Sequence, residues 1–185
     1  MAEKTSTWNR VALIAAMSKR APKGSLNRTA IMKCAYLLQT IRNVPLGYHF
    51  TLYSYGPYDS DVLGDLDYAE LLEAVTVKRV DHTGGYGYDI RAGAASDRIQ
   101  QKATIFLQKY AEEIAWVLQE FGARSSAELE LASTLVYADR ETPVASQTIS
   151  ELVRKVRDVK PHFAEERILV EAKALQEKKL LKSVR

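Results

Sequence analysis

The chain has 185 residues, a formal net charge of +3, 46% hydrophobic residues and 26% charged residues, which is the composition of an ordinary globular protein. Its single cysteine, Cys34, excludes an intramolecular disulfide and most zinc sites. No stretch approaches the roughly 18 consecutive apolar residues of a membrane span, and the first residues lack the apolar run of a signal peptide. We therefore expect a cytoplasmic protein of one domain, or of one domain with a small helical extension.

The first two predicted elements are helices. Residues 8–18 form an apolar helical stretch that Pro22 and Gly24 end. A second helix is predicted over residues 27–42. Its apolar side chains recur at steps of four and three, as expected for a helix face that points into a core, at Ile31, Ala35, Leu38 and Ile41.

The most distinctive segment follows, over residues 48–67. Aromatic residues and Thr alternate over 48–54 and favour a half-buried strand. Gly56 and Pro57 stop this strand, and because proline needs no N–H in a first helical turn, a helix is predicted from Pro57 to about residue 74. Asp59 and Asp61 would stabilise its first turn. The segment is therefore interpreted as a strand-to-helix corner, as an exposed Tyr and Asp surface for a partner, or as both.

The remaining chain predicts one hairpin and then helices only. Alternating runs at 75–80 and 86–91 flank a Gly84-Gly85 turn. One long helix is predicted over 96–121, and three more end near 137, 159 and 181, the second opened by a Thr148 and Glu151 capping box. The predicted fold is mainly α with a small β-hairpin (α+β). Residues 1–95 form a winged-helix-like domain in this interpretation, and residues 96–185 a helical bundle extension.

Charge is strongly segregated along the chain. Residues 1–42 hold eight basic side chains and one acidic one, whereas residues 43–77 hold six acidic side chains and no Lys or Arg. The two segments could neutralise each other as neighbouring helices. In a winged helix, the helix before the wing reads DNA, but here its carboxylates would repel phosphates. If DNA is bound, we expect the contacts to come from Arg10, Lys19, Arg20, Lys23, Arg28 and Lys33, with Lys78 and Arg79 at the wing.

The sequence contains no recognisable enzyme motif. His49, His82 and His162 stand apart and have no partners at metal-ligand spacing. Asp65 and Asp67 lie two residues apart on a predicted helix, so they point to different faces and do not form an acid/base pair. No Ser or Cys nucleophile has a recognisable signature. We therefore expect a protein without catalytic activity, cofactor or metal.

Several motifs together resemble a known family. They are the helix of residues 31–39, the strand into Tyr55-Gly56-Pro57-Tyr58, the helical stretch of 63–75 and the Gly-Tyr hairpin, with a weaker likeness at Lys160-Pro161-His162-Phe163. They resemble the bacterial YwgA-like proteins and, more distantly, the Panacea (SocA-like) antitoxin domain, over about residues 25–91.

This resemblance implies a non-enzymatic module that binds and neutralises a toxin or regulatory partner protein, or presents a partner to a protease. The acidic segment suits a toxin with a basic surface. The residues expected to face the partner are Tyr55, Tyr58, Asp59, Asp61 and Asp65. The alternative is a winged-helix DNA-binding transcriptional regulator that uses the basic N-terminal segment. The sequence leaves the oligomeric state open.

Overall fold

The computed structural model describes residues 6–184 and shows a mainly helical protein with two small antiparallel strand pairs. Its contacts divide the chain into two compact units. The first comprises residues up to 51 together with 58–126, and the second comprises 52–57 together with the residues from 127 onward. The expected domain boundary at residue 95 therefore falls inside the first unit. No helix in the described part of the chain is long and apolar enough to cross a membrane.

The first unit begins with the element order of a winged helix. Helices α1 (Thr7–Lys19), α2 (Arg28–Thr40) and α3 (Ser60–Leu71) are followed by strands β3 (Val75–His82) and β4 (Gly85–Ala92). Helix α3 packs against both α1 and α2. Between α1 and α2, Leu26 exchanges two backbone hydrogen bonds with Ile90 of β4, at 2.9 and 2.7 Å, and so forms an isolated antiparallel β-bridge to the hairpin. The predicted mainly α fold with a small hairpin is confirmed.

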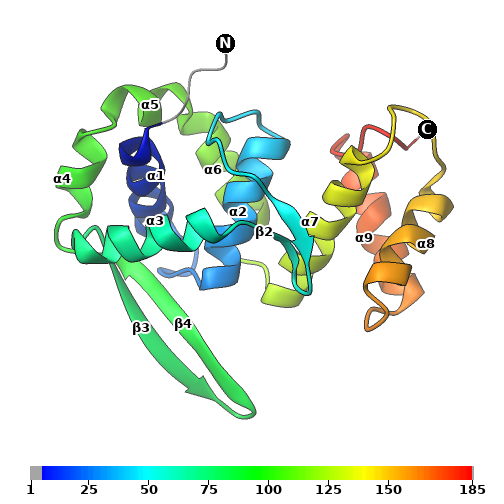
Figure 1. Cartoon of the computed structure of the whole chain (residues 1–185), viewed down its shortest axis with the longest axis horizontal. Helices are drawn as coiled ribbons and strands as arrows, with labels where there is room; N and C mark the ends of the chain where they lie inside the picture. Colours follow the sequence, from blue (N-terminus) through cyan, green and yellow to red (C-terminus); the bar gives the residue numbers. More distant parts are fainter. Residues whose placement is uncertain (1–5, 185) are drawn as a thin grey trace. The chain divides into compact units, whose positions relative to one another are not determined.

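Three short helices complete the first unit: α4 (Ser96–Gln101), α5 (Thr104–Lys109) and α6 (Ala111–Phe121). Helices α4 and α5 pack against α1, and α6 packs against α2 (Figure 1). Helices α3, α4 and α5 and the β3–β4 hairpin all pack against α1, and every residue from 11 to 18 is buried. The single helix predicted over 96–121 is wrong, because the chain bends at Lys102 and Tyr110 to bring its apolar residues onto two different helices.

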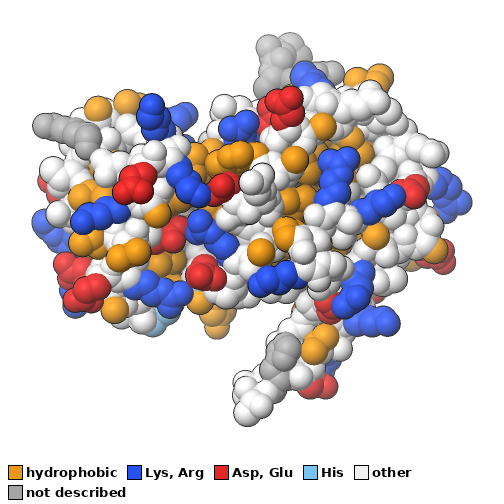
Figure 2. Space-filling model, turned by 180° about the vertical axis from the view of Figure 1, so that it is seen from behind, with side chains coloured by type: hydrophobic (Ala, Val, Ile, Leu, Met, Phe, Trp, Pro, Cys, Tyr) orange, Lys and Arg blue, Asp and Glu red, His pale blue; other side chains and the backbone are white. Residues whose placement is uncertain are grey.

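The hairpin of β3 and β4 is confirmed and is slightly longer than predicted, with a register that runs from Val75 opposite Ala92 to His82 opposite Gly85. Gly84 makes its turn with φ +94°. The hairpin projects from the helices of the first unit, and few of its visible side chains are hydrophobic (Figures 1 and 2).

Helices α7 (Ser126–Arg140), α8 (Ile149–Val159) and α9 (Glu165–Glu177) build the second unit. The predicted capping box at α8 is confirmed: the Thr148 hydroxyl accepts from the Glu151 N–H at 3.3 Å, and the Glu151 carboxylate accepts from the Thr148 N–H at 2.6 Å. The buried carboxylate of Asp139 accepts hydrogen bonds from the N–H groups of Lys182 and Ser183, each at 2.8 Å. These bonds tie the segment after α9 to α7.

The strand-to-helix corner differs from its prediction. Strands β1 (Thr51–Tyr53) and β2 (Gly56–Tyr58) form a short hairpin, so Pro57 lies in a strand and not at the start of a helix. Helix α3 begins three residues later, with the Asp59 side chain accepting from the Asp61 N–H at 2.9 Å as its N-cap. The first half of the expected strand is irregular, because the Gln39 amide supplies both backbone hydrogen bonds of Tyr48, at 2.9 and 3.0 Å.

Candidate partner-binding site

The Gly-Pro corner is part of the core of the second unit. Gly56 has φ +86°, and a Cβ placed on it would meet Thr134 Oγ1 at 3.1 Å, Ser133 Oγ at 3.2 Å and the Glu130 carbonyl oxygen at 3.4 Å. Gly56 and Pro57 are both buried. Two features therefore favour glycine at this position: its backbone conformation and the close approach of the short hairpin to α7.

A buried lysine, Lys160, bonds to the backbone of the same hairpin. Lys160 follows α8 and is 2% exposed. Its ammonium forms an ion pair with Glu130 Oε1 at 2.9 Å and donates hydrogen bonds to the carbonyl oxygens of Tyr53, at 3.1 Å, and Ser54. An ammonium has three N–H donors, and here there is an acceptor for each of them. We call this arrangement the Lys160 clamp.

The turn after α8 adds an exposed imidazole beside the clamp. His162 Nε2 lies 3.3 Å from Glu130 Oε1, and its ring lies 4.3 Å from that of the buried Phe163. The exposed residues Pro161 and His162 thus stand next to the residue that anchors the short hairpin.

Held in this way, the hairpin presents two tyrosines to solvent. Tyr53 is 63% exposed and Tyr55 is 75% exposed. We call Tyr53, Ser54 and Tyr55 the hairpin tip. Tyrosine is enriched in protein interfaces because it offers a large contact area at a small cost in side-chain entropy. The tip has the chemistry of a contact surface, and its backbone is fixed by Gly56 on one side and by the Lys160 clamp on the other.

The structure separates the residues that the sequence grouped as partner-facing. Tyr55 belongs to the second unit, and the other four belong to the first. Tyr58 and Asp59 are half-buried, and Asp59 caps α3 and accepts from the His49 N–H. Asp61 is exposed, as a contact surface requires.

The expectation that Asp65 faces a partner is corrected, because Asp65 is a buried residue of the first unit. Its Oδ2 accepts a hydrogen bond from the Tyr48 hydroxyl at 2.8 Å and forms an ion pair with Arg10 at 2.8 Å. Burial raises the pKa of Asp65 above its ordinary value, against the lowering effects of Tyr48 and Arg10. Burial, followed by the charge of Asp65, likewise raises the pKa of Tyr48. This side chain is bonded inside the first unit and is not offered to a partner.

Two of the basic residues expected to contact DNA are withdrawn from the surface of the first unit, and four others make contacts within that unit. Arg10 pairs with Asp65, and Lys33 is 3% exposed, so neither is a surface cation. The others are exposed or half-buried and have these contacts: Lys19 pairs with Asp97, Lys23 donates to the Ala123 carbonyl at 2.8 Å, Arg28 lies 3.8 Å from Asp67 and over the Tyr88 ring, and Arg79 pairs with Asp81 at 3.1 Å. Arg20 and Lys78 are exposed.

Within residues 6–184, no three His, Cys, Asp or Glu side chains gather as they would around a metal ion. Cys34 is fully buried, and burial raises the pKa of its thiol to about 12, which keeps it protonated and unreactive.

Sequence reasoning did not find Tyr53, Glu130, Lys160 or His162 as site residues. The Lys160-Pro161-His162-Phe163 stretch was noted for its family likeness, and this was the one signal available. Its role depends on contacts with the hairpin tip, which is 106 residues away in sequence from Lys160.

No family model matches the sequence, and a search of curated proteins finds no match.

Proposed function

We propose that this chain is a non-enzymatic protein-interaction module that binds and neutralises a partner protein, in the manner of an antitoxin. The observation that carries the proposal is the hairpin tip, with two highly exposed tyrosines on a backbone fixed by Gly56 and the Lys160 clamp. Aromatic anchors on a rigid support lose little entropy on binding, which favours tight association.

The charges in the first unit support a protein partner over DNA. Helix α3, which would enter the groove, exposes Asp61, Asp67 and Glu70. Phosphate binding requires cations that can replace counterions, but several of the candidate bases already pair with carboxylates. The bacterial toxin partner implied by the family resemblance belongs to this proposal.

The test is affinity capture by the tagged full chain from native lysate, with and without nuclease, followed by mass spectrometry. We expect a stoichiometric protein that survives nuclease treatment. Tyr53→Ser with Tyr55→Ser should reduce its recovery at least tenfold, because truncating an interface anchor typically costs about 2 kcal/mol or more. Tyr86→Ser is the matched control, since Tyr86 is also an exposed tyrosine on a hairpin, at 57%.

Two results would overturn the proposal. One is equal loss of the partner in the control and in the double variant. The other is recovery of nuclease-sensitive nucleic acid with no protein, in which case binding should also fall steeply with salt and with charge reversal at Lys78 and Arg79.

A further inference from the structure

The first unit also has a hollowed, basic surface of its own. Three neighbouring hollows, of about 610, 410 and 430 Å³, lie along α4 and α5 and share Gln101 in their walls. The largest shares Thr104 with the second and Lys102 with the third. We call them together the α4–α5 groove. Every residue that lines it belongs to the first unit, so the groove is distinct from the hairpin tip.

The charge of the groove is one-sided. Five basic side chains line it: Lys19, Arg20, Arg98, Lys102 and Lys109. The acidic residue in its walls is Asp97, which pairs with Lys19. The groove therefore favours a ligand with carboxylates or phosphates.

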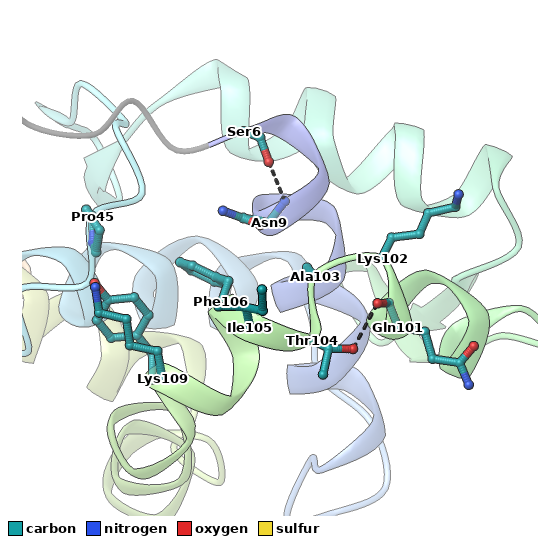
Figure 3. A pocket seen from close by; sticks show the side chains of 11 residues that line it. Ser6, Asn9, Pro45, Gln101, Lys102, Ala103, Thr104, Ile105, Phe106 and Lys109 are labelled. Atoms are coloured by element: carbon teal, nitrogen blue, oxygen red, sulfur yellow. Dashed lines mark hydrogen bonds between the residues drawn. The ribbon is translucent and has the colours of Figure 1, made fainter.

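The largest hollow also has an apolar floor. Figure 3 shows Phe106 pointing into it below Asn9, with Lys109 to one side and Lys102 to the other. Phe106 and Ala103 are mostly buried, whereas Ile105 at the rim is 84% exposed. The aliphatic rim and the Phe106 ring suit a Leu, Ile or Phe side chain.

Polar groups in the same wall can bond a peptide backbone. Asn9 and Gln101 carry amides that both donate and accept hydrogen bonds. Tryptophan rings stack on bases in many nucleic-acid sites. Trp8 is 38% exposed, and the Lys102 ammonium lies over its ring, 5.0 Å from the ring centroid, where a base would stack.

We propose that the α4–α5 groove binds an acidic peptide segment of a partner protein. The carboxylates of the peptide pair with Lys102 and Lys109, and one apolar side chain of the peptide enters the hollow over Phe106. This inference concerns a surface separate from the hairpin tip and does not depend on it.

Trp8 makes the proposal measurable. The chain has two tryptophans, and Trp116→Phe leaves Trp8, in the wall of the groove, as the single tryptophan, which is excited at wavelengths where tyrosine does not absorb. The full-length variant is titrated with a short capped peptide of glutamates and leucines. The comparison probes are a glutamate and serine peptide, a lysine and leucine peptide and oligodeoxythymidylate. Amide NMR shifts of the unmodified chain, titrated in parallel, report binding without the Trp116 change.

The Glu and Leu peptide should bind most tightly, change Trp8 emission and shift amides of α4 and α5. Lys102→Gln with Lys109→Gln should weaken it about fivefold to tenfold, from two exposed ion pairs. Lys173→Gln with Lys179→Gln removes the same charge from exposed positions of the second unit and should leave binding within twofold. Tighter binding of the oligonucleotide, equal binding of the Glu and Ser peptide, or amide shifts outside the groove would overturn the proposal.

Discussion

Replacing Lys160 by Met tests whether the Lys160 clamp holds the second unit together. The substitution keeps a long apolar stem but removes the charge. The Glu130 carboxylate, 6% exposed, then loses its ion-pair partner at 2.9 Å, and the carbonyl oxygens of Tyr53 and Ser54 lose their donor. Removing one member of a buried pair costs about 3–5 kcal/mol, because the other charge stays buried; here the exposed imidazole of His162 remains 3.3 Å from Glu130 Oε1. We expect a loss of stability of that size.

Native-state hydrogen exchange is the assay, because it reports α7, α8 and α9 separately from the first unit. A loss of about 3–5 kcal/mol lowers amide protection there by about two to four powers of ten. Emission from Trp8 and Trp116 follows the first unit, which contains both. Lys173→Met, at an exposed position of α9, is the control and should stay within about 0.5 kcal/mol.

A double variant separates the charge argument from simple damage to packing. Lys160→Met with Glu130→Leu removes both buried charges and should be more stable than Lys160→Met alone, since apolar replacement of a whole buried pair is often neutral. The reasoning is refuted if Lys160→Met costs less than about 1 kcal/mol, or if the double variant is no more stable than the single one.

Three further substitutions are expected to change stability in urea unfolding followed by circular dichroism. Gly56→Ala should cost about 1–3 kcal/mol, because alanine is strained at φ +86° and its Cβ meets Thr134; an unchanged midpoint would contradict this. Thr148→Ala should cost about 1 kcal/mol at pH 7. Hydrogen bonds from Thr148 lower the pKa of Glu151, so the capping box stabilises above about pH 4.5 and this cost should shrink as pH falls through the lowered pKa. Asp65→Asn should cost less stability at neutral pH than near pH 3.5. The pKa of Asp65 is raised in the native state, so the native state binds a proton more readily than the unfolded state and loses stability as pH rises through that pKa. A cost of the substitution that grows with pH would refute the raised pKa of Asp65.

The elements that could be predicted from the sequence are those with local signals. The α8 cap needs Thr148 and Glu151 three residues apart, and the long hairpin needs a glycine turn between alternating runs. Both signals lie within a few residues of the structure they specify, so tertiary contacts do not override them.

The rest depended on contacts between distant residues. Lys102 and Tyr110 are neither glycine nor proline, and the chain bends there because its apolar side chains must reach both α1 and α2. Asp65 has the sequence context of an exposed helix residue, but it is buried because Arg10 and Tyr48, far away in sequence, meet it.

Residues 52–57 belong to a unit whose other residues begin at 127, and this separation has a consequence for folding during synthesis. The hairpin tip leaves the ribosome long before α7 and Lys160 exist to receive it, and Lys160 meets Tyr53 across 107 positions. Contacts of such long range form late because closing the intervening chain is entropically costly. Until α7 and Lys160 have been synthesised, the hairpin therefore lacks the contacts that hold it in the folded protein.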